Sequence, residues 1–244
     1  MGIDLNKRSE RVRIVLEKRK LPVVPKMRVG LALDISGSAE GLYRSGVMQE
    51  TVERLLAVAM RFDDNGEMDM WAFHNRQYSL PVATAKNFEN YVQRDILNND
   101  KVRLWGGTEY APVLGSMEKH WFGGAPAARP APKGFFGKLF SGASDTSPSP
   151  ARPADNSPAL GMLITDGSNS DPREAAEFLR FAQDRKAYWL MVGVGNPKEF
   201  TFLERMADEL PHVGFVSIAN LTMTDDQLYE AMLSEELCTW VGKQ

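Results

Sequence analysis

The sequence predicts an α/β protein: a doubly wound, mostly parallel, six-stranded sheet with helices on both faces. Two observations carry this prediction. Apolar runs of strand length alternate along the chain with segments of helical period, and such alternation is typical of parallel sheets that helices cover on both sides. The chain has 244 residues, of which 43% are hydrophobic and 25% charged. It is therefore long and apolar enough to bury a substantial core.

The first half of the domain is expected to hold three strands and three helices. The helix after the first strand carries its apolar residues on one stripe, as an amphipathic helix does. The third strand is short and returns after a turn at His74-Asn75, and the turn WGGTEY opens the third helix, which ends near Trp121. In chain order these elements are expected at 28–34 (strand), 46–62 (helix), 68–74 (strand), 76–82 (strand), 87–97 (helix) and 105–121 (turn and helix).

The second half repeats the strand–helix alternation three times. Its first helix begins at Asp171-Pro172, with the aspartate as N-cap and the proline at the first helical position, both favoured residue types there. The elements are expected at 158–166 (strand), 171–184 (helix), 187–195 (strand), 200–208 (helix), 213–219 (strand) and 225–240 (helix).

Two segments depart from this pattern and divide the chain into a basic N-terminal segment, 1–26, and a domain, 27–242, that an insertion interrupts. Residues 5–26 contain eight Lys or Arg against two Glu. They are interpreted as a solvated helix that leads into the first strand, with a basic docking surface for an acidic partner as the alternative.

The insertion, residues 123–158, holds seven of the 14 prolines together with many Ala, Ser and Gly. This composition cannot bury enough apolar surface to order itself, so a flexible segment is expected. Within it, four apolar residues would share one face of a short helix. They either fold back on the domain or dock another molecule. These residues are Phe135, Phe136, Leu139 and Phe140.

Composition also narrows the function. A net charge of −3 gives no reason to expect nucleic-acid binding. The single cysteine, Cys238, excludes an intramolecular disulfide and favours a half-buried structural thiol in a reducing compartment. No apolar run approaches the roughly 20 residues that span a bilayer. A cytoplasmic location without a transmembrane segment is expected.

Three polar clusters fall where strands end or a helix begins. In an open parallel sheet, ligands bind outside the carboxyl ends of the strands, where the connecting loops diverge. Oxygen ligands of this kind suit Mg²⁺, or Mn²⁺ or Ca²⁺, better than zinc. The five candidate ligands, two carboxylates and three hydroxyls, are Asp34, Ser36, Ser38, Thr108 and Asp166.

These clusters, DISGS at 34–38, the threonine of GGT at 108 and the aspartate of TDG at 166, resemble the metal-ion-dependent adhesion site of the von Willebrand factor A (vWA) family. The resemblance implies direct ligation by Ser36 and Ser38, and by Asp34 directly or through water. It implies that Thr108 ligates in one state of its loop, with Asp166 in the outer shell.

Within the family, FDDNGEMDMWAFHN, GGTEYAPV and ITDGSNSD look most like the bacterial A domains of tellurium-resistance proteins, which are associated with stress responses and protein assembly. A binding module is therefore expected, not an enzyme. Its metal would hold a carboxylate from a partner protein, because a site with two carboxylates leaves one coordination position for an outside acid.

Two alternatives stay open. A metal-dependent hydrolase, most plausibly a phosphoesterase, needs a positioned base, and the sequence offers only His74. A turn histidine that hydrogen-bonds locally is the plainer interpretation of that residue. The other alternative is a scaffold with a vestigial metal site, in which the insertion and the basic segment do the binding.

Overall fold

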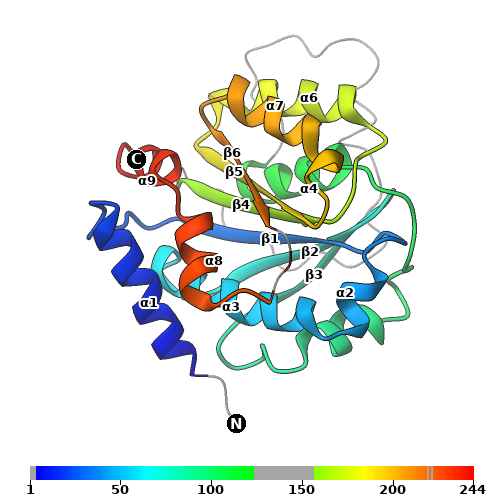
Figure 1. Cartoon of the computed structure of the whole chain (residues 1–244), viewed down its shortest axis with the longest axis horizontal. Coiled ribbons are helices and arrows are strands. Elements are labelled where there is room, and N and C mark those ends of the chain that lie inside the picture. The colour runs from blue at the N-terminus through cyan, green and yellow to red at the C-terminus, as the bar shows by residue number, and fades with distance from the viewer. Residues whose placement is uncertain (1–3, 124–156, 219, 221) are drawn as a thin grey trace.

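The computed structural model describes residues 4–123, 157–218, 220 and 222–244. It confirms the expected architecture, a six-stranded sheet in the order β3-β2-β1-β4-β5-β6 (Figure 1). Neighbouring strands are parallel except β3, which returns antiparallel to β2. The strands are β1 Arg28–Asp34, β2 Met68–Phe73, β3 Gln77–Ala83, β4 Ala159–Thr165, β5 Ala187–Val194 and β6 Val213–Ile218.

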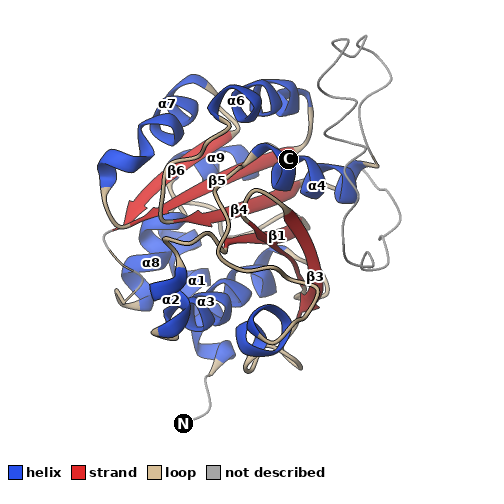
Figure 2. Ribbon diagram, turned by 90° about the vertical axis from the view of Figure 1, so that its right-hand side faces the viewer, coloured by secondary structure: helices blue, strands red, loops and turns tan. Residues whose placement is uncertain are grey.

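Helices cover both faces of this sheet (Figure 2). Helices α1, α3, α8 and α9 bury their apolar residues on one face, and α4, α6 and α7 on the other. The helical elements are α1 Leu5–Lys18, α2 Glu40–Arg44, α3 Val47–Phe62, η1 Val92–Leu97, α4 Ala111–Phe122, α6 Pro172–Phe181, η2 Ala182–Asp184, η3 Pro197–Phe200, α7 Thr201–Glu209, α8 Asp225–Met232 and α9 Glu235–Val241.

The order of the strands fixes where a ligand site can form. From β1 the chain moves outward through β2 to β3, and from β4 it moves outward on the other side through β5 to β6. The direction of winding therefore reverses between β1 and β4, which pair in parallel from Arg28 with Ala159 to Leu33 with Ile164. The crevice beyond the carboxyl ends at such a reversal is where doubly wound sheets bind ligands.

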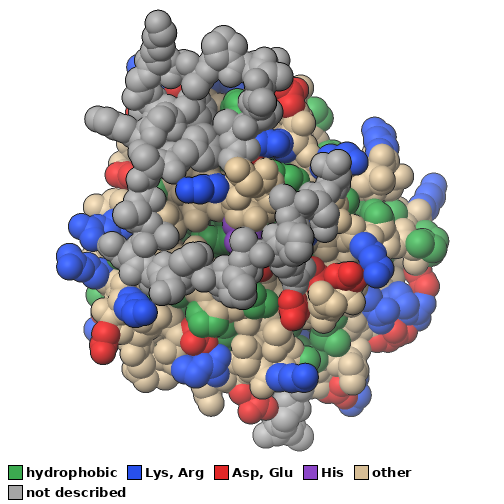
Figure 3. All heavy atoms as spheres, turned by 180° about the vertical axis from the view of Figure 1, so that it is seen from behind, with side chains coloured by type: hydrophobic (Ala, Val, Ile, Leu, Met, Phe, Trp, Pro, Cys, Tyr) green, Lys and Arg blue, Asp and Glu red, His purple; other side chains and the backbone are tan. Residues whose placement is uncertain are grey.

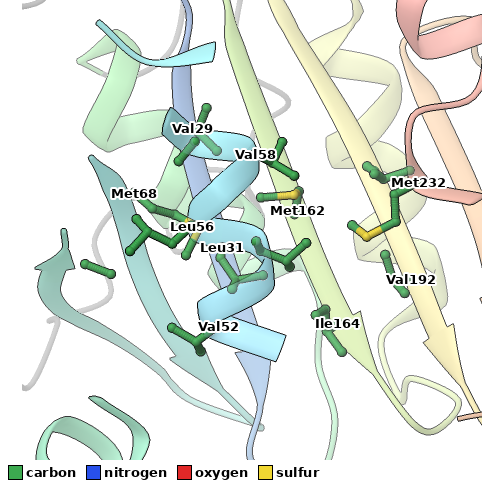
Figure 4. Close-up of a cluster of buried hydrophobic side chains, with 14 of the residues drawn as sticks. Val29, Leu31, Val52, Leu56, Val58, Met68, Met162, Ile164, Val192 and Met232 are labelled. Carbon is green, nitrogen blue, oxygen red and sulfur yellow. The ribbon is translucent and has the colours of Figure 1, made fainter. Parts of the chain in front are cut away.

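The core on the α3 face holds these central strands in place. Val52 and Leu56 of α3 are fully buried and gather with Leu31 of β1 (Figure 4). On the opposite face Gly30 of β1 leaves room for an indole ring, since a Cβ atom there would lie 2.5 Å from Trp121. The central strands, whose carboxyl ends form the rim where a ligand can bind, are thus packed on both faces.

Helix α1 belongs to the packed domain, so the expectation of a solvated helix is wrong for one of its faces. Val12 and Leu16 are buried against the rest of the chain, and α1 contacts both α3 and α8. Its basic side chains pair with acidic residues of α8. The ion pairs are Arg8 with Asp225 (3.2 Å), Arg11 with Asp226 (3.3 Å) and Lys18 with Glu230 (2.9 Å).

The helix expected at 87–97 is shorter and differently wound, because a side chain from α3 enters its first turn. Gln49 donates from Nε2 to the carbonyl of Phe88 and accepts from the amide of Val92, both at 2.8 Å. These two groups would have been bonded to each other in an α-helix over 87–97, and the regular part is instead the π-helical turn η1, Val92–Leu97.

The closing helix, expected to be continuous over 225–240, breaks in two. Leu233 leaves helical geometry, and Ser234 accepts a hydrogen bond from the amide of Leu237. A serine in this position is an efficient N-cap, and it starts α9 as a separate helix. Cys238 of α9 is a free, buried thiol, and burial raises its pKa to about 11, in agreement with a structural role.

The apolar docking patch expected at 135–140 lies outside the described residues. Over the described surface seen from behind, Lys and Arg side chains are interspersed with Asp and Glu (Figure 3). In the part of the chain that the structure describes, every helix is too short or too polar to cross a membrane.

Candidate metal centre

The carboxylate of Asp34 lies at the end of β1, fully buried at the reversal of the sheet. Its Oδ1 atom accepts a hydrogen bond from the amide of Ser36 at 2.7 Å, and Oδ2 accepts one from the hydroxyl of Thr165 at 2.6 Å. The backbone carbonyl of Asp34 accepts from the hydroxyl of Tyr43 at 2.9 Å. Both carboxylate oxygens are therefore held in fixed orientations.

Burial sets the charge state of this carboxylate. It raises the pKa of Asp34 to about 6, although the hydrogen bonds from Thr165 and Ser36 act in the opposite direction. The pKa of Asp166 is raised as well, again mainly by burial. A nearby cation would favour the charged form of both groups. Two desolvated carboxylates at one rim are thus an arrangement that a divalent ion would stabilise.

Four of the five predicted ligands form one chain of contacts. The hydroxyl oxygens of Ser36 and Ser38 lie 3.1 Å apart, and Ser38 donates to Oδ1 of Asp166 at 2.9 Å. Ser36 in turn is bonded to Asp34 through its amide. Ligands at about 2.1 Å from an octahedral Mg²⁺ lie about 3 Å from their neighbours. The two oxygen–oxygen spacings among Ser36, Ser38 and Asp166 therefore fit one small hard cation.

Thr108 reaches the same rim by a different route, through backbone contacts of its loop. Ser36 and Gly106 form an isolated parallel bridge, and the amide of Gly37 donates to the carbonyl of Gly106 at 3.0 Å. The carbonyl of Thr108 accepts from both the amide (2.8 Å) and the hydroxyl (2.9 Å) of Ser170. The loop is thus tied to the segments that follow β1 and β4, and Thr108 is half-buried.

His74 packs against this loop. Its Nδ1 atom accepts from the amide of Arg76 at 3.0 Å, and its Nε2 atom lies 3.2 Å from the hydroxyl of Tyr78. The ring is buried, and burial lowers its pKa. Both ring nitrogens already have partners, so the interpretation as a turn histidine agrees with the structure better than a role as general base.

Several residues of the site were not anticipated. Thr165 stands directly before Asp166 and contributes its hydroxyl to Asp34. Tyr110 donates its hydroxyl to the carbonyl of Gly167 at 2.8 Å. Asp171 is the N-cap residue of α6 by position, but its carboxylate accepts from the amides of Tyr110 and Ala111 at the start of α4. The sequence signal was present only for Asp171, which is the N-cap residue of α6 as predicted, but the contact of its carboxylate with α4 was not predicted.

The donor set determines which ions fit. Within residues 4–123 and 157–244, apart from the two undescribed positions, no three His, Cys, Asp or Glu side chains are grouped as a metal site would need. The candidate centre has two carboxylates and depends on hydroxyl oxygens for its other protein ligands. Such a set suits Mg²⁺, with water completing the shell, better than ions that prefer nitrogen or sulfur.

Comparisons with known proteins identify similar chains. A family model described as a vWA domain of the type found in the TerF C terminus matches residues 26–131 and 148–244. The uncharacterized protein YcbR of Bacillus subtilis (strain 168) is 34% identical over 238 residues, which cover 96% of this chain and 84% of YcbR.

Solved structures share the fold at low identity. Proximal thread matrix protein 1 from the mussel byssus superposes with a TM-score of 0.54 at 15% identity over 88% of this chain. A form of this protein with zinc in its MIDAS motif (the metal-ion-dependent adhesion site) gives a TM-score of 0.55, also at 15% identity and over 88% of this chain. The ArnB paralog VWA2 from Sulfolobus acidocaldarius gives 0.50 at 11% identity over 86% of this chain. The chain spans 48%, 49% and 45% of these three structures, about half of each.

Proposed function

The chain belongs to the vWA-TerF-like family, and from this premise we propose that it is a protein-binding module whose binding depends on a divalent metal ion. The observation that carries the proposal is the chain of contacts that runs from Asp34 to the amide of Ser36, and from the Ser36 hydroxyl through that of Ser38 to Asp166. It lies at the reversal of the sheet, the position where a doubly wound fold offers a ligand site.

The proposed ion is Mg²⁺, with Mn²⁺ and Ca²⁺ as alternatives. Asp34, Ser36, Ser38 and Thr108 would hold it, with Asp166 in the outer shell. The ion supplies positive charge and open coordination positions when bound. The mussel protein, whose structure is described with zinc in its MIDAS motif, supports the idea that this type of fold accommodates a divalent ion. The oxygen-only donors of the present chain are the reason for proposing a harder one.

The proposed partner is a protein that contributes a carboxylate to the ion. Two carboxylates balance a dication, and neutral hydroxyls and water fill the other positions. An incoming acidic side chain can replace a water molecule there. The family model's relation to TerF supports a place in a bacterial tellurium-resistance or stress-response assembly, and the free thiol of Cys238 supports a reducing, cytoplasmic setting.

We propose binding and not turnover. Hydrolysis needs a base that can take a proton from water or substrate, and the imidazole of His74 is already engaged by Arg76 and Tyr78. A scaffold with a vestigial metal site makes the opposite prediction about the ion, so direct titration separates it from the proposal.

The test is isothermal titration of the full chain with MgCl₂ and with MnCl₂. Wild type should bind one ion, and Ser36→Ala and Ser38→Ala should weaken binding. Ser45→Ala is the matched control, because that hydroxyl donates to the carbonyl of Leu42 outside the chain of ligands. No binding heat for wild type with either ion would support the scaffold instead. Capture of protein partners with and without EDTA, compared with Asp34→Ala, then tests the second half of the proposal.

A further inference from the structure

The loop that carries Thr108 begins with a strained tryptophan. Trp105 has a φ of +65°, a left-handed conformation that bulky residues rarely adopt and that costs about 1–2 kcal/mol. The two residues that follow it are glycines, yet neither Gly106 nor Gly107 has a positive φ. Of these three residues, the left-handed conformation is thus adopted by Trp105, for which it costs the most. The contacts around Trp105 must compensate for that cost.

Those contacts connect Trp105 to the metal centre in two ways. Its amide donates to the carbonyl of Ile35 at 2.9 Å, within the DISGS segment. Its ring stands edge-on against Tyr43, with the ring centroids 5.6 Å apart. Tyr43 is buried, and its hydroxyl donates to the carbonyl of Asp34. The indole ring thus packs against Tyr43, whose hydroxyl is also hydrogen-bonded to the end of β1.

The backbone after Trp105 then follows a defined path. Gly106 lies beside Ser36 in the parallel bridge and accepts from the amide of Gly37. On its other side it is closed in by His74, because a Cβ atom on Gly106 would lie 2.6 Å from Nδ1 of that ring. Two residues later the chain reaches Thr108. A shift at Trp105 would therefore move the Thr108 loop relative to the serine ligands.

We propose that Trp105 is the positioning residue of the metal centre: its ring, packed on Tyr43, and its left-handed backbone together set the Thr108 loop against the DISGS segment. The effect of Trp105 on metal binding rests on the metal site of the proposed function. Its effect on the position of the Thr108 loop does not depend on the ion. Trp105 acts through the loop and is not itself a ligand.

The first readout is Mn²⁺ affinity of the full chain, measured by titration and by electron paramagnetic resonance of free Mn²⁺. An aromatic pair contributes about 0.5–1.5 kcal/mol, so Trp105→Ala should weaken binding about two- to thirteenfold. Trp105→Phe, which keeps a ring against Tyr43, should recover most of that loss. The matched control is Trp240→Ala, which removes a similar aromatic contact, with Tyr188 at a centroid distance of 5.5 Å, near the start of β5 and away from the rim.

The second readout needs no metal. Amide hydrogen exchange at Gly37, whose N–H donates to Gly106, should be faster in Trp105→Ala than in wild type and close to wild type in Trp105→Phe. The amide of Trp189 is bonded to the carbonyl of His212 at the other end of the sheet. Its exchange rate should not change in Trp105→Ala or in Trp105→Phe.

The outcomes separate the two proposals. If wild type binds Mn²⁺ and Trp105→Ala binds it equally well, or if Trp240→Ala weakens it as much, the positioning role is wrong and the metal site stands. If wild type binds no Mn²⁺, the proposed function is wrong. Exchange at Gly37 then decides alone: an unchanged rate in Trp105→Ala overturns the positioning role, and a faster one supports it.

Discussion

The hydroxyl of Thr165 at the end of β4 donates a 2.6 Å hydrogen bond to Oδ2 of Asp34 at the end of β1. This contact joins the two strands between which the sheet reverses, and both partners are buried. It fixes one carboxylate oxygen, while the amide of Ser36 fixes the other. The orientation of the carboxylate is thus established by protein contacts alone.

Replacing Thr165 with valine should destabilise the protein by about 1–3 kcal/mol at pH 7.5 without metal, because a buried charged acceptor loses its donor. Thr165→Ser keeps the hydroxyl and should retain most of the stability. Urea unfolding followed by circular dichroism measures both. At pH 5 the loss in Thr165→Val should be smaller, since Asp34 is then mostly protonated. Equal losses in the two variants would contradict this account.

The stability of the metal-free protein should depend on the charge of Asp34. Its pKa is raised from 3.8 to about 6 in the folded state, so folding takes up a proton between these values. The free energy of unfolding should therefore fall by about 1.3 kcal/mol as the pH rises from 5 to 7, which is the upper part of a total effect of about 3 kcal/mol.

The matched variant for this pH dependence is Asp34→Asn, which removes the titrating group and leaves a similar shape. It should show a much weaker decrease, with the remainder coming from Asp166, whose pKa is raised in the same direction. Unfolding curves in EDTA at pH 5, 6 and 7 provide the measurement. A decrease of the same size in both proteins would assign the effect to other groups.

Metal removal should lower thermal stability. An ion that binds only the folded state at a hundred times its dissociation constant stabilises it by about 2.7 kcal/mol. The Tm of wild type should rise on adding MgCl₂ and return on adding EDTA, as followed by differential scanning fluorimetry. The double variant of Ser36 and Ser38 to alanine should lose this shift, and Ser45→Ala should keep it. A shift that persists in the double variant would place the ion elsewhere.

Gly106→Ala should damage the rim, whereas Gly107→Ala should not. A Cβ atom on Gly106 would lie 2.6 Å from His74 and 2.7 Å from Asn75, while nothing lies within 4 Å of the same atom on Gly107. The first substitution should cost about 1–3 kcal/mol and weaken Mn²⁺ binding. The second should leave stability within about 0.5 kcal/mol. Chemical unfolding and Mn²⁺ titration of the pair test this, and similar behaviour of both would refute the packing argument.

Arg8→Ala should destabilise the domain more than Arg13→Ala, although both residues lie on α1. Arg8 is largely buried and lies within ion-pair distance of Glu53 (3.7 Å) and Asp225 (3.2 Å). Its loss leaves Asp225 with Arg54 alone (3.1 Å) and Glu53 with the neutral amide of Gln49 (2.8 Å), and it should cost about 2 kcal/mol. Arg13 pairs with Glu10 and Glu17 on the exposed side of the helix, where such pairs contribute about 0.2–1 kcal/mol. Urea midpoints decide, and equal losses would mean that the network is unimportant.

The sequence was informative where the chemistry is local. DISGS places three ligands within five residues at the end of an apolar strand, and the rule for parallel sheets brings TDG to the same edge. The closeness of the two clusters followed from those two facts, whereas the order of the strands was not predicted. Helix boundaries were also well predicted where a cap or proline marks them, as at Pro172.

The features that were missed depend on contacts between distant segments. The π-helical turn η1 arises because Gln49 enters it from α3, 43 residues earlier. Asp171 caps a helix that starts 60 residues before it, and Thr165 supports a carboxylate 131 residues away. Each of these residue types has an ordinary local interpretation, so the sequence alone gave no reason to prefer the distant partner.

The packing of α1 has a practical consequence for anyone who isolates this domain. The family match starts at residue 26, and a fragment cut there would lack the helix that covers part of α3 and α8. The apolar residues that α1 covers would be exposed to solvent, and acidic residues of α8 would lose the basic partners that α1 supplies. A recombinant fragment should therefore start before Leu5 if it is to remain monodisperse.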